Sequence, residues 1–194
     1  MSKFFFSIIT VVLNSKNDLI ETIKSLKDQK NKNFQYIVID GGSTDGTIEI
    51  LKENNQVIDY WISEKDQGIY DAMNKGLAIA DGEYIGILNA GDKYTPEGLE
   101  IIHRYLKNNN YDFIFGTVQK KILKYKINKN RIFWNFDFYT SHSSGFFIKK
   151  ESQKILGKYN LKYKISSDYD LFYRMIVKEK MRGSLCVIDV NGRK

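Results

Sequence analysis

Four short segments of the chain gather carboxylate, amide and glycine residues, the types that bind nucleotides and divalent cations. A carboxylate can accept hydrogen bonds from a base or a ribose or can hold a cation, and glycine lets the backbone approach a ligand closely. Turns and helix caps use the same residues, so each segment taken alone also fits a structural role. The segments are Asn14, Asp40-Gly41-Gly42-Ser43-Thr44-Asp45-Gly46, Glu64-Lys65-Asp66-Gln67-Gly68 and Asn89-Ala90-Gly91-Asp92.

Each segment follows a short apolar run that predicts a buried β-strand. The alternation of such runs with helix-period stretches indicates an α/β domain with a largely parallel sheet. Ligands bind at the carboxyl ends of the strands in such sheets, so we expect the four segments to meet at one edge. Ile20 and Ile69 are assigned to the buried faces of their helices. The predicted strands are 6–13, 36–40, 60–63 and 84–88, and the predicted helices are 18–29, 47–53 and 69–80.

The pattern changes after Tyr111, where lysine and aromatic residues become frequent. Pro96 is expected to open a helix, because proline favours the first helical position. No repeat or linker interrupts the chain, so a single domain over 1–194 is predicted, with functional halves at 1–112 and 113–194. Further predicted elements are strands at 113–115, 123–127 and 145–148, a helix at 167–180 and a last apolar run at 185–190.

Charge is divided unevenly between these halves. Residues 1–112 hold 12 basic and 17 acidic side chains, a net charge of −5, whereas residues 113–194 hold 18 and 6, a net charge of +12. The acidic half suits cation binding, and the basic half suits phosphates, an anionic membrane or nucleic acid. The single cysteine, Cys186, excludes an internal disulfide and fits a reducing compartment. The apolar run 4–13 is too short to span a bilayer, so a cytoplasmic location is expected.

Two common nucleotide-binding motifs are absent. Gly41 and Gly46 have the spacing of the outer glycines of a phosphate-binding loop, but Thr47-Ile48 stands where that loop has Lys-Ser/Thr. The dinucleotide fingerprint also fails, because Ser43 occupies the position of its second glycine. A nucleotide site in this chain is therefore of another kind.

The chain contains, in this order, SIITVVLN, VIDGGSTDGT, SEKDQGIYDAMNKGLAIADGEYIGILNAGD and SSDYDLFYR. These blocks resemble the family 2 glycosyltransferases with the GT-A fold, closest to the bacterial members that build exopolysaccharide and lipopolysaccharide. The resemblance covers residues 5–180 and implies a three-layer α/β/α fold with a central, mainly parallel sheet. It also implies inverting transfer of a sugar from a nucleotide-diphosphate sugar, here expected to be a UDP-sugar, with Mn²⁺ or Mg²⁺.

The resemblance implies a role for each residue that matches a family motif. Asp168 stands at the position of the catalytic base. Asp92 stands in the metal-binding Asp-x-Asp motif, although Asn89 and Gly91 replace aspartates that many members have. The residues expected to bind the nucleotide sugar are Thr10, Val11, Asn14, Asp40, Asp66, Asn74, Lys75, Asn89, Asp92 and His142.

Within this set, Asp40 is expected to accept a hydrogen bond from the base, and Asp66 lies in the segment that meets the nucleoside. Asn74 and Lys75 are expected near the donor. Asp71 and Lys75 are four residues apart on a predicted helix, so a surface ion pair is the alternative role for Lys75.

Several of these residues have structural alternatives. Ser167 to Asp170 also fits a capping box, in which Asp170 reaches back to the helix N-terminus and leaves Asp168 free to act as a base. Arg174 is placed to bind a phosphate or to pair with Asp170 four residues earlier. His142 matches a family position near the donor, whereas lone histidines are more often structural.

The expected partners are a nucleotide-sugar donor and a saccharide or lipid-linked acceptor. Six basic residues in 120–131 precede an aromatic cluster in 133–139, a composition that suits peripheral contact with the inner face of an anionic membrane or, alternatively, a solvated lysine strand. Nucleic acid is not expected, because the predicted ligand edge is acidic. Family members usually continue beyond the last predicted helix, so the acceptor side is expected to be minimal or C-terminally incomplete.

Two other functions remain open at this point. A sugar nucleotidyltransferase shares the layered architecture, but the segment Asn14-Ser15-Lys16-Asn17 lacks the glycines of its phosphate loop. A nucleotide- or lipid-binding module without catalytic activity is the second alternative, suggested by Gly91 and the short C-terminal part.

Overall fold

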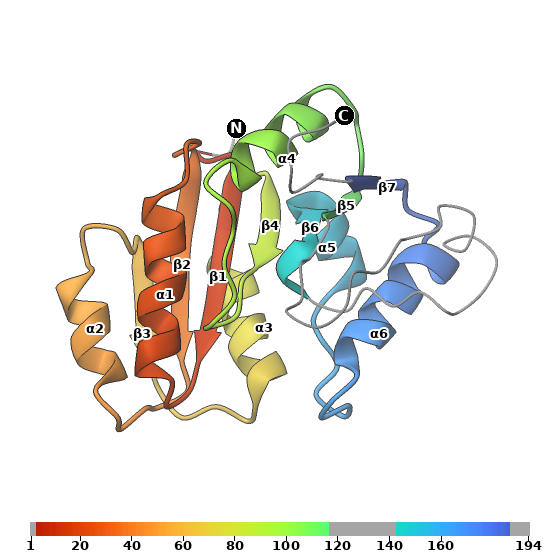
Figure 1. The fold of residues 1–194 in the computed structure, drawn as a ribbon. Helices are drawn as coiled ribbons and strands as arrows, with labels where there is room; N and C mark the ends of the chain where they lie inside the picture. Colours follow the sequence, from red (N-terminus) through yellow and green to blue (C-terminus); the bar gives the residue numbers. More distant parts are fainter. Residues whose placement is uncertain (1–2, 117–142, 187–194) are drawn as a thin grey trace, which may run out of the picture.

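The structure, a computed structural model, describes residues 3–116 and 143–186 of the chain (Figure 1). Its centre is a seven-stranded sheet with the strand order β3-β2-β1-β4-β6-β5-β7. The strands are β1 (Phe6–Val12), β2 (Phe34–Asp40), β3 (Tyr60–Ser63), β4 (Tyr84–Ile87), β5 (Phe113–Gly116), β6 (Phe146–Lys149) and β7 (Gly183–Cys186). The helices are α1 (Lys16–Lys27), α2 (Thr47–Glu53), α3 (Ile69–Ile79), α4 (Gly98–Lys107), η2 (Ser143–Gly145), α5 (Lys150–Leu156), α6 (Ser167–Tyr173) and the π-helical turn η3 (Arg174–Lys178).

The sheet is mainly parallel, as predicted. β1 pairs in parallel with β2 and β4, and β2 pairs in parallel with β3. β6 lies antiparallel between β4 and β5, and β7 runs parallel to β5. The sheet therefore contains strands from both predicted halves of the chain, while the functional division at residue 112 stays a prediction.

Helices cover both faces of the sheet and give the three-layer α/β/α arrangement. One buried cluster joins α1, α2 and α4 to Phe6 and Ile8 of β1, and the other joins α3 and α6 to Ile9 and Val11. Successive side chains of a strand point to opposite faces, so a central strand covered on both sides must be apolar almost throughout. Every residue of β1 is buried, which explains the unbroken apolar run in the sequence. Figure 1 shows α1 and α2 in front of the sheet and α3 behind it.

The elements predicted for the first half of the chain are confirmed, with small differences. Ile20 and Ile69 are 39% and 46% exposed instead of buried. Ile20 lies one residue from Leu19, at the margin of the face that α1 buries, and Ile69 is the first residue of α3. Pro96 does not open α4, because the helix begins at Gly98.

The second half follows the prediction less closely. β6 and the helical stretch from Ser167 to Lys178 are present, whereas α5 was not predicted. The predicted strand at 123–127 and residues 187–190 of the last apolar run lie outside the described residues. In the described part of the chain, every helix is too short or too polar to cross a membrane.

Candidate active site

The four polar segments do meet at the carboxyl edge of the sheet, at the bottom of Figure 1. The N–H of Gly41 donates to the carbonyl of Val12 at 2.9 Å, which joins the ends of β1 and β2. The N–H of Glu64 donates to the carbonyl of Asp40 at 3.0 Å, and Ala90 donates to Val11 at 3.3 Å. These backbone contacts confirm that strands far apart in the sequence bring their polar ends together.

Asp40 is fully buried at the end of β2 and holds the loop that follows it. Its Oδ2 accepts hydrogen bonds from the N–H groups of Gly42 and Ser43 and from the Ser63 hydroxyl, at 3.1, 2.9 and 2.5 Å. Its Oδ1 accepts from the Ser43 hydroxyl. These four contacts give Asp40 a structural role and do not support its predicted contact with the base.

Asn14 ties the loop after β1 to the loop after β2. Its backbone adopts a positive φ of 48°, its N–H donates to Ser43 Oγ at 2.7 Å, and its Oδ1 accepts from the Thr44 N–H at 2.8 Å. Asp45 strengthens the same junction by accepting from the N–H of Lys16 at 3.0 Å. Asn14 is exposed beside these bonds, a position compatible with its predicted role.

Asp66 lies directly over Gly41. A Cβ added to Gly41 would stand 2.6 Å from Asp66 Oδ2 and 3.4 Å from Leu13 Cδ1. The other carboxylate oxygen accepts from the N–H of Gly68 at 2.9 Å, just before α3 begins. A half-buried carboxylate is thus held between the ends of β1 and β2, which is compatible with the predicted contact between Asp66 and the nucleoside.

Thr10 and Val11 lie inside the sheet and do not line an open site. Thr10 is fully buried and Val11 nearly so, because helices cover both faces of β1. Their side chains are packed inside the sheet, and their pocket-lining role stays a prediction.

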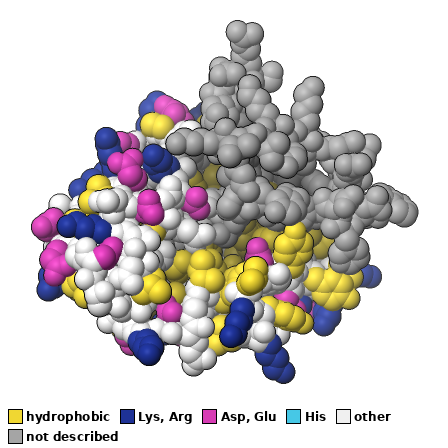
Figure 2. Space-filling view, turned by 60° about the horizontal axis from the view of Figure 1, so that its bottom comes forward, with side chains coloured by type: hydrophobic (Ala, Val, Ile, Leu, Met, Phe, Trp, Pro, Cys, Tyr) yellow, Lys and Arg dark blue, Asp and Glu magenta, His cyan; other side chains and the backbone are white. Residues whose placement is uncertain are grey.

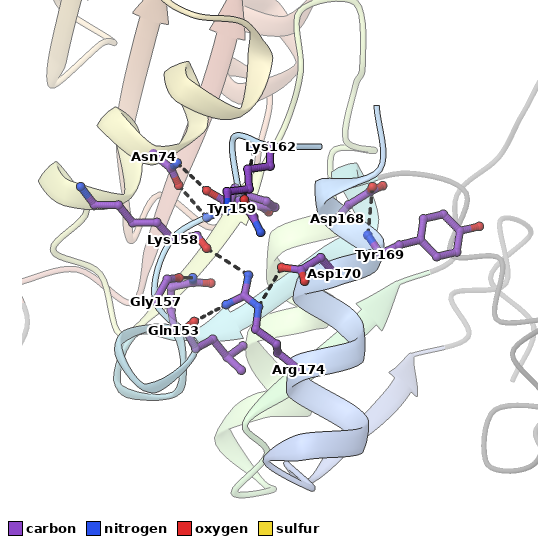
Figure 3. A network of polar contacts seen from close by, with 12 residues as sticks. Asn74, Gln153, Gly157, Lys158, Tyr159, Lys162, Asp168, Tyr169, Asp170 and Arg174 are labelled. Atoms are coloured by element: carbon purple, nitrogen blue, oxygen red, sulfur yellow. Dashed lines mark hydrogen bonds and ion pairs between the residues drawn. The ribbon is translucent and has the colours of Figure 1, made fainter. Parts of the chain in front are cut away.

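Asn74 joins α3 to the chain after α5. Its Nδ2 donates to the carbonyl of Tyr159 at 3.0 Å, and its Oδ1 accepts from the N–H of Tyr159 at 2.8 Å (Figure 3). This paired contact is buried, so Asn74 serves as a clamp between elements, and its predicted position near the donor is not supported.

Lys75 is held by acidic neighbours. Its ammonium lies 2.7 Å from Glu64 and 3.7 Å from Asp71, so the ion pair considered as an alternative is present. The pKa of Lys75 is raised, mainly by the hydrogen bond with Glu64. Lys75 therefore remains positively charged beside the segment that contains Asp66.

The segment after β4 places Asp92 beside the turn that precedes β6. The N–H of Gly91, at a φ of 94°, donates to the Thr22 hydroxyl at 2.9 Å, and that hydroxyl donates to the backbone carbonyl of Asp92 at 3.0 Å. The Ser144 hydroxyl donates to Asp92 Oδ2. Asn89 accepts at its carbonyl from the N–H of Asp92 at 3.0 Å. Ser144 is a neighbour that the sequence did not indicate.

A metal ion at Asp92 would need a bound molecule to supply most of its coordinating atoms. Among the described residues, no group of three or more His, Cys, Asp or Glu side chains lies close enough together to hold a metal ion. Asp92 Oδ1, however, makes no hydrogen bond with the described residues, so one hard oxygen remains for a cation. Mg²⁺ commonly combines one or two carboxylates with phosphate oxygens, so this residue fits a shared site.

Asp168 lies in the first turn of α6, which begins at the same end of the molecule as the polar segments (Figure 1). Its Oδ1 accepts from its neighbour Tyr169 N–H at 3.0 Å and from the Tyr70 hydroxyl at 3.1 Å. The same hydroxyl lies 3.0 Å from the carbonyl of Ile165. Burial and the charge of Asp168 raise the pKa of Tyr70, which keeps the phenol protonated. Tyr70, four residues after Asp66, was not predicted as a site residue.

The predicted capping box at α6 is wrong for Asp170. Instead of reaching back to the helix N-terminus, its carboxylate pairs with Arg174 at 2.9 Å (Figure 3). Arg174 also donates to the carbonyls of Leu156 and Lys158, so it holds the chain that leads from α5. His142 and the basic and aromatic segment 120–139 lie outside the described residues.

The sequence model described as "Glycosyl transferase family 2" matches residues 7–175. An uncharacterized glycosyltransferase of Mycobacterium tuberculosis is 29% identical in an alignment of 206 positions that covers 96% of this chain and 75% of the relative. A glycosyltransferase named for PGL/p-HBAD biosynthesis in Mycobacterium bovis is 27% identical, over 90% of this chain and 70% of the relative.

Solved structures resemble this fold over nearly the whole chain. Staphylococcus aureus TarS superposes with a TM-score of 0.80 at 18% identity, over 95% of this chain and 35% of TarS. TarS 1–349 in complex with UDP-GlcNAc gives 0.75 at 18% identity, over 93% and 55%. A mannosyltransferase from Pyrobaculum calidifontis, in complex with GDP-Man and Mn²⁺, gives 0.68 at 18% identity, over 97% and 58%.

The chain thus spans between about a third and three fifths of the length of these solved proteins. Their likeness concerns the fold, while the family match rests on the sequence itself and extends from β1 into the helical stretch after Asp168. On that match, this chain belongs to glycosyltransferase family 2, and it has the GT-A fold of those enzymes.

Proposed function

We propose that this chain transfers a sugar, with inversion at the anomeric carbon, from a nucleotide-diphosphate sugar to a saccharide or lipid-linked acceptor in cell-surface polysaccharide synthesis. The observation that carries the proposal is the arrangement of Asp168. Both of its hydrogen bonds end on Oδ1, and Oδ2 makes none with the described residues. A fixed carboxylate with one open oxygen is what a general base requires.

In the proposed reaction, Asp168 Oδ2 takes the proton of the acceptor hydroxyl while that oxygen attacks the anomeric carbon. The bond between this carbon and the diphosphate oxygen breaks, and the nucleoside diphosphate leaves with the electron pair. Tyr70 acts as a positioning residue, because its protonated hydroxyl holds Oδ1. Its raised pKa is consistent with that donor role.

The proposed donor is a UDP-sugar whose base contacts the loop ends of β1 and β2. Asp66 is the carboxylate we assign to the N3–H of the uracil base, in place of the buried Asp40. The solved TarS complexes contain UDP and UDP-GlcNAc, and the Pyrobaculum calidifontis mannosyltransferase contains GDP-Man, which supports a nucleotide-sugar donor. Asn14 and Lys75 are proposed to complete the donor side.

Asp92 is proposed to bind Mn²⁺ or Mg²⁺ together with the donor diphosphate. A divalent ion there would offset the negative charge that develops on the leaving group. The Pyrobaculum calidifontis mannosyltransferase was solved in complex with Mn²⁺ as well as GDP-Man, and Asp92 Oδ1 offers this chain's own ligand. A cytoplasmic location is proposed from the single cysteine, which fits a reducing compartment.

A panel of UDP- and GDP-sugars tests this function, first by thermal unfolding with and without Mn²⁺ and then by release of nucleoside diphosphate. A true donor at about a hundredfold excess over its dissociation constant should stabilise the fold by about 3 kcal/mol and should be consumed. Stabilisation without consumption in the presence of acceptor saccharides would identify a binding module instead. Absence of stabilisation by every nucleotide sugar would contradict the proposal.

A further inference from the structure

The loop between α5 and α6 exposes apolar and basic side chains next to one another. This segment comprises residues 157–166 and is named here the α5–α6 loop. Three of its apolar side chains are exposed, Leu161 to 44%, Tyr163 to 48% and Ile165 to 87%. The segment contains no acidic residue. Figure 2, which views the molecule toward the lower edge of Figure 1, shows hydrophobic side chains gathered on this face, with Lys and Arg side chains and some Asp or Glu side chains among them. The exposed lysines of the α5–α6 loop are Lys158, Lys162 and Lys164.

The α5–α6 loop, which carries these exposed side chains, is held near both of its ends. Near its start, the buried side chain of Asn74 makes its paired hydrogen bonds with the backbone of Tyr159, at 3.0 and 2.8 Å (Figure 3). Near its end, the Tyr70 hydroxyl lies 3.0 Å from the carbonyl of Ile165 and shares its one proton between that carbonyl and Asp168 Oδ1. Both anchors come from α3, so the middle of the loop is presented from a fixed base.

The chemistry of the exposed side chains favours one class of partner. A saccharide or a nucleic acid offers no environment for the bare aliphatic side chains of Leu161 and Ile165. A second copy of the same surface would bring like-charged lysines together. A bilayer with anionic headgroups accommodates both features, because aliphatic and aromatic side chains enter the headgroup boundary while lysines extend toward negative charge.

We propose that the α5–α6 loop docks on an anionic lipid bilayer. Leu161, Tyr163 and Ile165 enter the boundary between headgroups and acyl chains, and the lysines bind the headgroups. Docking in this way fixes the height of α6 above the membrane, since the Tyr70 hydroxyl contacts both Ile165 and Asp168, at 3.0 and 3.1 Å. On the proposed function, the general base would then face acceptors carried by the membrane; the docking itself does not depend on that reaction.

Vesicle flotation with the full chain tests the docking surface. Vesicles of phosphatidylcholine alone are compared with vesicles that contain about 30% phosphatidylglycerol, at low salt and at about 0.5 M salt. The test variants are Lys164→Ser/Ile165→Ser and Leu161→Ser/Lys162→Ser. Ile20→Ser/Lys24→Ser removes one exposed isoleucine and one exposed lysine from α1 and is the matched control.

The wild-type chain and the control should float with anionic vesicles at low salt and should be released by high salt. Each test variant should bind at least about tenfold more weakly, since one lysine near anionic lipid already contributes about fivefold. Equal binding by test variants and control, or no flotation of the wild-type chain, would overturn the proposal. Flotation needs neither donor nor turnover, so a negative result leaves the proposed reaction intact, and an inactive enzyme that floats leaves the docking surface intact.

Discussion

Individual residues at the carboxyl edge divide into those that build the loops and those that stay open to a ligand. Asp40 and Asn74 were predicted to bind the donor, yet each is buried and satisfied by neighbouring groups of the protein. The sequence could identify them as residues with hydrogen-bonding capacity near the edge. It could not tell whether a ligand or the adjacent backbone uses that capacity, because short polar side chains bond to nearby backbone as readily.

Gly41 shows the same limit of prediction from sequence, because the group that approaches it could not be identified. The sequence indicates a glycine where backbone approaches something closely, and the structure identifies that neighbour as the Asp66 carboxylate. Gly41→Ala should displace this carboxylate, because the new Cβ would stand 2.6 Å from Oδ2. We expect about tenfold weaker UDP binding by calorimetry with little loss of stability, since the displaced atom ends a flexible side chain. Unchanged affinity would remove Asp66 from the base-binding site.

Tyr70 is a site residue that the sequence did not indicate, because its partner Asp168 lies 98 residues away. Tyr70→Phe should keep the fold and lower kcat by about ten- to a hundredfold while the KM for the donor stays nearly constant, since the carboxylate loses its orientation. Tyr105→Phe, on the exposed part of α4, is the control and should leave both constants unchanged. A rise in KM with normal kcat would indicate a donor contact instead of a positioning role.

Elements were predicted best where hydrophobic periodicity alone determines them. The strands β1 to β4 and helices α1 to α3 alternate regularly, and the parallel sheet follows from that alternation. α5 was missed because its seven residues are mostly polar and begin directly after β6. The antiparallel position of β6 between β4 and β5 depends on long-range pairing, which a local pattern does not contain.

The close packing of α3 on the sheet gives a prediction at this scale. A Cβ at Gly76 would stand 2.4 Å from Ile9 Cγ2, so Gly76→Ala should force the helix away from β1. We expect a loss of about 1–3 kcal/mol in the free energy of unfolding, measured with urea. Gly98→Ala in α4 meets no atom closer than 3.4 Å and should cost nothing or add stability. Equal changes in the free energy of unfolding for the two variants would show that α3 can accommodate a Cβ at residue 76 without moving away from β1.

The whole molecule buries several tyrosines whose ionisation should unfold it at alkaline pH. Burial raises the pKa of Tyr36, Tyr94 and Tyr159 above the ordinary value and raises that of Tyr84 to about 12. The folded chain therefore retains protons that the unfolded chain loses. This stabilisation is complete below the unfolded pKa of about 10 and is lost as pH rises toward the folded values.

The free energy of unfolding, measured in denaturant between about pH 8 and 11, should consequently stay level and then fall above about pH 10. Tyrosinate absorbance recorded on the same samples reports the ionisation directly. A chain that ionises all of its tyrosines near pH 10 while it remains fully folded would contradict the raised pKa values of these four tyrosines.

In the proposed reaction, Asp168 removes the acceptor proton and takes no part in holding the donor. With a donor identified from the nucleotide-sugar panel, Asp168→Asn should lower transfer by at least about a thousandfold while its affinity for UDP stays within about twofold of the wild-type value. Asp170→Asn, two residues along the same helix and paired with Arg174, should retain transfer. Near-normal transfer by Asp168→Asn, or loss of its UDP binding with an intact fold, would contradict the role of Asp168 as the general base.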